Sequence, residues 1–347
     1  MRPKPSLAWS KVSARLDTAQ ALRAADNLYA LANKRVAVEF SPDTKRVVEA
    51  IVSADGLAAF TSDEDLRKAV ALKAAVTGTT RWITVACKFS DIATEQLPVS
   101  FYQSEDGIAP GEVGHYGPDV SCGRLILTGS DAYGWFVLPQ PRSFYVTTDA
   151  SGNKDANLDQ LFKDCAAVAD ATVTFTGAQG INMMFNGDLD DYAWGGSACG
   201  ILDGSNKCIR NTWNPPWSFN NLAPLSHEMG HGYGLPHSDN SDGDSDTYDN
   251  PWDVLSDAWN NAVPNATYGS LPKHINVQQR ERLGWIDAAR KLTVPVGGAA
   301  DQVQLDFASL AASGNLQMIA LPMAAADSGG KVIYVVEARV RSGTYEN

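Results

Sequence analysis

Histidine is scarce in this sequence, and long apolar runs are missing from it. There are five histidines in 347 residues. No apolar run approaches the ~18–20 residues that a membrane-spanning helix needs, so we expect no membrane span. The opening MRPKPSLAWSKVSARLDTAQ lacks the apolar core of a signal peptide. The protein therefore stays inside the cell, leaves it by another route, or extends beyond residue 1.

Basic residues are also in deficit, with 28 Lys and Arg against 40 Asp and Glu and a formal net charge of −12. Nucleic acid and anionic membranes would repel such a protein, so neither is an expected partner. Residues 238–257 hold seven Asp and no Lys or Arg. The loop 239–249 suits Ca²⁺, although its spacing is not that of an EF-hand, and a solvated acidic loop is the alternative.

Cysteine is sparse and odd in number, with five in the chain. Cys199 and Cys208 close the short loop CGILDGSNKC, which predicts a disulfide formed in an oxidising compartment. Cys87 and Cys165 each lie in an apolar stripe and are interpreted first as small buried hydrophobic residues. Pairing of Cys122 with either of them stays open.

Composition and periodicity divide the chain into three parts. Residues 1–78 form a leading, propeptide-like segment, with helical stretches near 17–33 and 62–76 around the strand-like RVAVEF. Residues 79–290 carry the motifs described below. Residues 291–347 are rich in strand-like sequence and predict the start of a β-rich, sandwich-like domain that the end of the sequence truncates.

Residues 79–290 predict an α+β (α/β-like) layer arrangement, because strand-like and helix-like segments alternate along them. The expected elements are a strand over 81–91, two strands joined by a turn within 123–139, a helix over 156–173, a buried strand over 180–187, loop from 187 to 221, and a helix over 275–286.

Three of the five histidines lie in SHEMGHGYGLPHS, residues 226–238. On a helix, His227 and His231 project from one face one turn apart and can share a Zn²⁺ at ~2.0–2.1 Å. Glu228, displaced by about 100° around the helix, is placed to contact a water on the metal. Gly234 would end the helix in a left-handed conformation, and His237 would return as a third ligand. Three histidines with one open position are typical of catalytic zinc.

The alternative is a helix whose histidines are surface groups or hydrogen-bonded core groups. It explains neither the glycine nor the third histidine of the motif. For the single histidines His115 and His274 the ordinary hydrogen-bonded or surface role is expected. Asn221 is the expected N-cap of the helix, with Pro224 in its first turn.

Residues 227–237 match the metzincin zinc signature HExxHxxGxxH. The surroundings resemble gametolysin-type and immune-inhibitor-A-like secreted metallopeptidases over about residues 81–286. The segments that carry this resemblance are CKFSD, GRLILTGSDAYGWFVLPQPRSFY, NMMFNG, YDNPWDVLS and QQRERLGWI. The resemblance implies a metzincin catalytic domain with a twisted mixed sheet and a zinc-binding helix, in a secreted, extracellular protein.

The resemblance also implies a zinc-dependent endopeptidase that acts on proteins or peptides. His227, His231 and His237 would hold the zinc, and Glu228 would act as general base and then protonate the leaving amine. Neighbouring Asp residues are candidates to orient the imidazoles. The stretches WNPPWSF and YAWGGSACG would line the cleft, or they serve only aromatic-proline packing.

The alternative function is a non-catalytic, metal-stabilised binding protein derived from a metallopeptidase. The intact Glu228 counts against it, because a structural zinc site needs no general base.

Two departures from the metzincin pattern affect these expectations. Leu255 stands where metzincins place a methionine in a turn beneath the zinc. Leucine is apolar and similar in volume, so the hydrophobic floor can survive. Neither Cys nor His precedes residue 87, which excludes a thiolate latch from the leading segment. The sequence sets neither the cleavage preference nor the oligomeric state.

Overall fold

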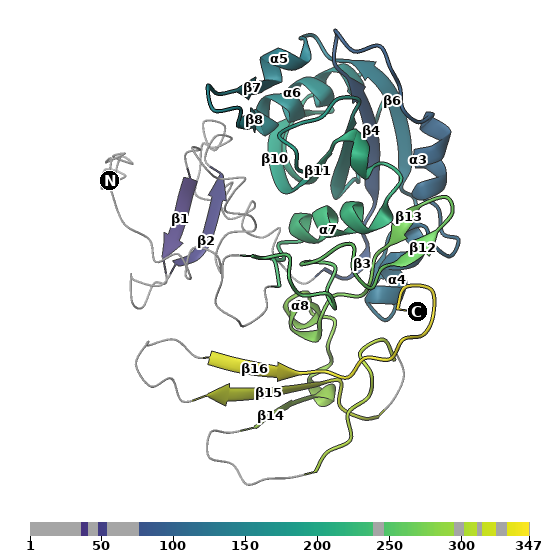
Figure 1. Cartoon of the computed structure of the whole chain (residues 1–347), viewed down its shortest axis with the longest axis vertical. Helices are drawn as coiled ribbons and strands as arrows, with labels where there is room; N and C mark the ends of the chain where they lie inside the picture. The colour runs from purple at the N-terminus through teal and green to yellow at the C-terminus, as the bar shows by residue number, and fades with distance from the viewer. Residues whose placement is uncertain are drawn as a thin grey trace, which may run out of the picture.

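The computed structural model describes residues 36–40, 48–53, 76–238, 246–294, 302–310, 314–323 and 332–346. The predicted helices near 17–33 and 62–76 fall, but for Val76, outside these residues, as does most of the acidic loop. The described part is a mixed α+β structure around a twisted mixed sheet, which confirms the expected fold class at this level (Figure 1).

The central sheet has five strands in the order β10-β11-β9-β4-β6. Four of them run parallel, and β10 pairs antiparallel with β11 at the edge. The strands are β4 (Trp82–Lys88), β6 (Asp131–Val137), β9 (Gly180–Phe185), β10 (Trp194–Leu202) and β11 (Ser205–Asn214). The predicted strands over 81–91 and 180–187 are therefore confirmed.

One face of this sheet is covered by α6 (Leu158–Ala169), the helix expected over 156–173. Asn157 caps it, because its side chain accepts a hydrogen bond from the backbone N–H of Gln160. The apolar stripe of α6 packs mainly on β10, with further contacts to β6 and β4, and it forms one apolar core with side chains of the sheet. Burial of this stripe explains why the helix forms here.

Two disulfides cross-link this part of the chain. Cys199 and Cys208 lie directly opposite each other on β10 and β11, so the predicted disulfide is confirmed. Cys87 on β4 is bonded to Cys165 on α6, with their Cα atoms 6.0 Å apart. These two are buried, as expected, but their buried position brings them face to face across the strand–helix interface. Cys122 pairs with neither and is a free cysteine.

The opposite face of the sheet is covered by α7 (Leu222–Gly232). Some of the sheet residues on this face are polar. Thr84, Asn182 and Thr212 stand in register on three neighbouring strands and are fully buried. We call these three residues the polar row. The hydroxyl of Thr212 donates to Oδ1 of Asn182 at 2.9 Å. The next position along the row, on β10, is Gly195.

The expectation of a loop from 187 to 221 is wrong, because β10 and β11 are the two longest strands in the described part of the chain. Gly195, one of the glycines that suggested a loop, allows close packing instead. A Cβ at Gly195 would lie 2.0 Å from the carbonyl oxygen of Glu228. Glycine therefore allows α7 to approach the edge strand closely.

Shorter elements complete this part of the molecule. They are α3 (Val99–Glu105), α4 (Val113–Val120), α5 (Arg142–Tyr145), α8 (Val277–Arg282) and the strand pairs β1–β2 (Val36–Phe40, Val48–Ser53), β3–β5 (Gly78–Thr79, Leu125–Ile126), β7–β8 (Val146–Thr148, Lys154–Ala156) and β12–β13 (Val263–Asn265, Gly269–Leu271). Both strands predicted within 123–139 form, but β5 pairs with β3 and β6 with β4, so they do not form a hairpin.

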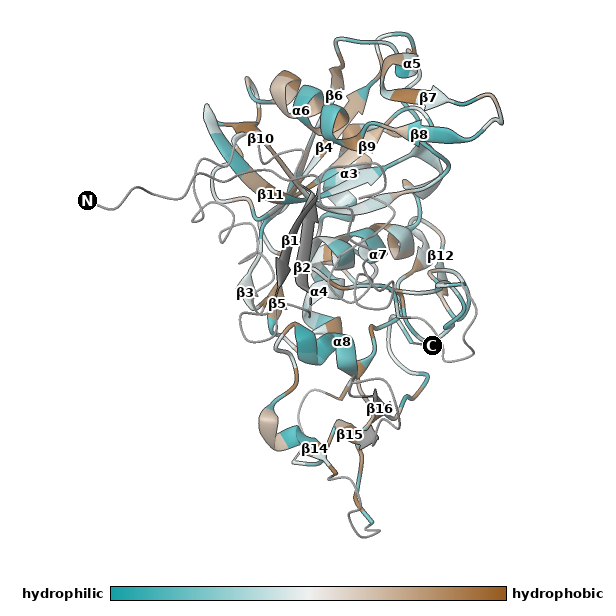
Figure 2. Cartoon of the chain, turned by 90° about the vertical axis from the view of Figure 1, so that its left-hand side faces the viewer, coloured by the Kyte–Doolittle hydropathy of each residue, from teal (hydrophilic) through white to brown (hydrophobic). Residues whose placement is uncertain are grey.

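The last part of the chain forms a three-stranded sheet of β14 (Lys291–Thr293), β15 (Met318–Met323) and β16 (Val332–Val336), as its β-rich sequence predicts. The short, largely hydrophilic α8, shorter than the expected helix over 275–286, lies between this sheet and α7 (Figures 1 and 2). Tyr345 returns to the first part of the molecule and is buried against Tyr116 of α4. Among the described residues, no helix is long and apolar enough to cross a membrane.

Candidate metal centre

The helix α7 carries the first two histidines of the motif, and the turn after it delivers the third. Gly234 has a φ of +86°, the predicted left-handed conformation, and the N–H of Leu235 bonds back to the carbonyl of Gly230. Asn221 occupies the N-cap position, but its side chain does not cap the helix. It accepts from the N–H of Ser270 and donates to the carbonyl of Trp217 instead.

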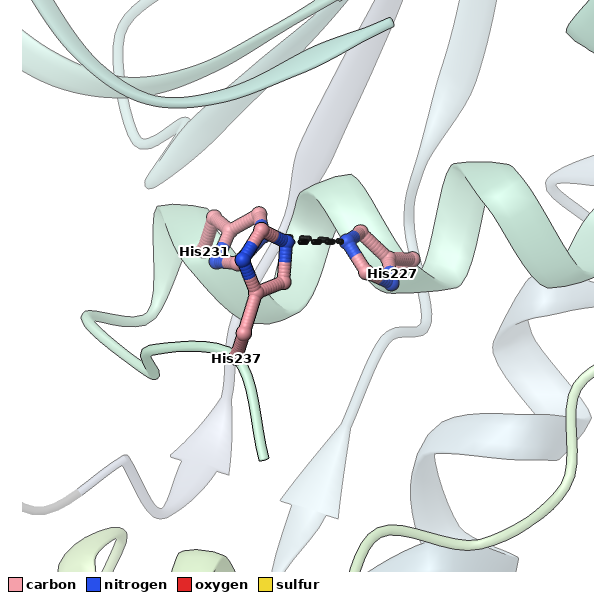
Figure 3. A group of neighbouring side chains, drawn as sticks. All are labelled: His227, His231 and His237. Atoms are coloured by element: carbon pink, nitrogen blue, oxygen red, sulfur yellow. Dashed lines mark hydrogen bonds between the residues drawn. The ribbon is translucent and has the colours of Figure 1, made fainter. Parts of the chain in front are cut away.

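The three histidine side chains converge on one point (Figure 3). The Nε2 atoms are 3.0 Å apart between His227 and His231, 3.1 Å between His227 and His237, and 3.2 Å between His231 and His237. Nitrogen ligands ~2.0–2.1 Å from a tetrahedral zinc would be separated by about 3.3 Å. The residues present therefore fit such an ion. Among the described residues, no other group of three His, Cys, Asp or Glu is arranged this way.

The protonation of the imidazoles supports the same conclusion. Nδ1 of His227 lies 2.6 Å from the carbonyl oxygen of Val254, and Nδ1 of His231 lies 2.7 Å from that of Leu235. Both Nδ1 atoms must therefore donate, which leaves lone pairs on the two Nε2 atoms that face each other. Two lone pairs at 3.0 Å repel, and a cation between them removes the repulsion.

Burial keeps these rings neutral. It lowers the pKa of His227 to about 3, with a smaller contribution from the nearby His231, and the pKa of His231 to about 4. The pKa of His237 is also lowered, by burial and by the two other imidazoles. The Asp residues expected to orient the rings do not do so for His227 and His231, since main-chain carbonyls take that place.

Glu228 lies beside the cluster on the wall of the same cavity, which has a volume of about 240 Å³. Its side chain is almost fully buried, and burial raises its pKa to about 8. Within the described part of the chain, no hydrogen-bond partner engages this carboxylate. It is thus available to a molecule that enters the cavity.

The turn at 253–255 supports the helix from below. Leu255 is fully buried, and a Cβ at Gly230 would lie 2.9 Å from its two methyl carbons. Gly230 lies on α7 between the two histidines, so Leu255 forms an apolar floor under them. The preceding residue, Val254, supplies the carbonyl that orients His227.

Tyr248 belongs to the site, although the sequence did not single it out. Its ring centroid lies 4.8 Å from that of His237 and 6.0 Å from that of His227, and it lines the cavity. Because an acidic segment separates Tyr248 from His237 in the sequence, their spacing does not predict that the two rings lie close together. The residues that line the cavity are Tyr192, Ala193, Trp194, Asp246, Thr247, Tyr248, Glu228 and the three histidines.

The two aromatic stretches proposed for the cleft behave differently. YAWGGSACG contributes Tyr192, Ala193 and Trp194 to the cavity wall. From WNPPWSF, Trp217 is half-exposed, packs against Trp259 and is not among the lining residues. The first stretch therefore contributes to the site. The second serves packing, with Trp213 and Phe219 buried in the core and Trp217 at the surface.

The remaining two histidines are hydrogen-bonded elsewhere, as expected. Nδ1 of His115 lies 3.0 Å from the hydroxyl of Tyr345. His274 is buried between Asp119, at 2.6 Å, and Arg280, at 2.8 Å. Neither contributes to the metal centre.

No model of a known protein family and no curated protein matched this chain.

Proposed function

We propose that this protein is a zinc-dependent endopeptidase of the metzincin type, which hydrolyses peptide bonds in protein or peptide substrates. The observation that carries the proposal is the convergence of three unprotonated imidazole nitrogens, from two buried histidines and one partly buried histidine, beside an unengaged glutamate in one cavity. The motif HExxHxxGxxH supplies these residues in the order that the chemistry needs.

His227, His231 and His237 would hold the ion and leave one coordination position open, which favours zinc in a catalytic site. When bound, zinc supplies Lewis acidity toward a water molecule and the scissile carbonyl. The main-chain carbonyls of Val254 and Leu235 hold two of the rings in the tautomer that binds a metal.

Glu228 is the proposed proton carrier. It adjoins His227 in the helix but points elsewhere around its axis, so it reaches the cavity without being a ligand. Its carboxylate takes the proton of the attacking water and passes it to the leaving amine. Tight packing against Gly195 fixes the backbone that carries it.

We also propose that the protein is secreted. Two disulfides, Cys87–Cys165 and Cys199–Cys208, suit an oxidising compartment. The metallopeptidases that the sequence resembles are secreted enzymes as well.

The decisive experiment is Glu228→Gln, because glutamine keeps the size of the side chain but cannot accept the proton. We expect hydrolysis of casein by the zinc-loaded protein to fall by about 10²–10⁴-fold. Zinc content, by elemental analysis, and the melting temperature should stay unchanged. The matched control is Glu95→Gln, a surface glutamate paired with Lys88, which should retain full activity.

Two results would contradict the proposal. Undiminished, chelator-sensitive hydrolysis by Glu228→Gln would place the activity elsewhere. A wild-type protein that binds zinc tightly but hydrolyses nothing would be the metal-stabilised binding protein instead.

A further inference from the structure

Two aromatic side chains form one wall of the cavity beside the metal centre. Tyr192 and Trp194 both line it, and their ring centroids lie 5.8 Å apart at an interplanar angle of 58°. Tyr192 is more than half exposed, although a large aromatic side chain is normally buried. A pair of tilted rings on an open wall offers π faces to a ligand.

An acidic side chain lies behind this pair. The indole N–H of Trp194 donates to Oδ1 of Asp190 at 2.7 Å. An anionic acceptor at the indole nitrogen increases the negative charge on the ring face. Because a cation is attracted by that charge, Asp190 strengthens the ring as a partner for ammonium or guanidinium groups.

Apart from the zinc ion that the three histidines would hold, the lining of the cavity carries no positive side chain. It includes the acidic residues Glu228 and Asp246 and no Lys or Arg. Lys154 and Arg142, which contact the turn before Tyr192, are engaged by Asp188 or Asp191. Away from the proposed zinc ion, no basic side chain of the cavity wall would repel a cationic group from the two rings.

We infer that this cleft selects substrates with a lysine or arginine close to the scissile bond, with the cationic side chain seated on Tyr192 and Trp194. The inference rests on the proposed function and names its substrate class. The aliphatic part of such a side chain packs on the rings, while the charged end is attracted by their π faces.

Matched peptides test the inference in catalysis. In each pair, one position near the scissile bond holds lysine or its uncharged counterpart norleucine, and a second set compares arginine with citrulline. We expect kcat/KM to favour the cationic peptide by about 3- to 30-fold. Tyr192→Leu should bring this ratio close to one, and Asp190→Asn should lower it in part. Trp217→Leu, an exposed tryptophan outside the cavity, should leave it unchanged.

A binding measurement separates this inference from the proposed function. Fluorescence anisotropy of the same labelled peptides on zinc-loaded Glu228→Gln should show the lysine preference without turnover, and the preference should weaken with salt. Equal binding of lysine and norleucine peptides, or a preference that survives in Tyr192→Leu, would overturn the inference. A lysine preference in binding by a protein that hydrolyses nothing would refute the proposed function and leave this inference standing.

Discussion

The two faces of the central sheet are built in different ways. Under α6 the contact is apolar and is closed by a disulfide from β4 to the helix. Under α7 the apolar side chains of the sheet are interrupted by the polar row, and at Gly195 the backbone of the helix lies close to the edge strand. Apolar contacts tolerate many arrangements, whereas a buried hydrogen-bonded row and a glycine contact permit few. The difference suggests that one face mainly stabilises the fold and the other mainly fixes the position of the metal centre.

Removal of the Cys87–Cys165 disulfide tests the stabilising face and should have the largest effect. The loop that this bond closes spans a sequence separation of 78, for which chain entropy predicts a loss of about 4–5 kcal/mol on reduction. Cys87→Ala with Cys165→Ala should therefore lower the free energy of unfolding by this order in a urea titration. Zinc affinity below the unfolding transition should stay the same.

The Cys199–Cys208 disulfide provides the comparison, because its sequence separation is only 9 and the expected loss is about 2.5 kcal/mol. Equal losses for the two double variants would show that loop entropy does not govern this face.

Gly195→Ala tests the other face. The new methyl group would lie 2.0 Å from the carbonyl oxygen of Glu228, so α7 must shift. Overpacking of this kind lowers the free energy of unfolding by about 1–3 kcal/mol. We expect the rate of casein hydrolysis to fall by more than this loss of stability alone would cause. Gly196→Ala, at a position with open space around it, is the matched control. Equal stability and equal hydrolysis of casein in the two variants would show that the close approach of α7 to Gly195 does not position the site.

Asp106→Asn tests the charge on the α7 face, where Asp106 is hydrogen-bonded to Thr84 of the polar row. Burial is the main cause that raises its pKa from 3.8 to about 7. Between about pH 4 and pH 7, Asp106 therefore keeps its proton in the folded protein but loses it in the unfolded chain. The free energy of unfolding is highest below pH 4 and falls as the pH rises toward 7, by at most about 1.4 kcal/mol per pH unit.

The asparagine variant should lose this dependence, so its stability relative to wild type should rise between pH 5 and 8 in urea titrations. The exposed Asp155→Asn serves as the control. If the difference in unfolding free energy between wild type and Asp106→Asn is the same at every pH, Asp106 does not titrate in this range.

Leu255→Met should have the smallest effect. An apolar void of about 30 Å³ lies beside Leu255 under α7 and can take the longer side chain. We expect a change in unfolding free energy below ~1.5 kcal/mol, unchanged zinc content and a modest change in turnover. A tenfold gain in kcat would show instead that the leucine had weakened an inherited site.

The histidine cluster could be predicted from the sequence because its geometry is local. Two histidines on one helical turn, a glycine that ends the helix and a third histidine are all set by spacing within eleven residues. The partners of these residues are distant in sequence and could not be predicted in this way. Gly195, Tyr248 and the bond from Cys87 to Cys165 depend on how the chain returns, and glycine-rich strands resemble loops until a helix packs on them.

The orientation of two ligands by main-chain carbonyls has a consequence for how this gene can change. Every amino acid carries a carbonyl, so a codon change at Val254 or Leu235 replaces a buried side chain but keeps the acceptor that holds the ring. A ring held by an aspartate would lose its acceptor in a single mutation. The orientation of these imidazoles therefore does not depend on which side chains Val254 and Leu235 carry, and those side chains are free to vary as packing allows.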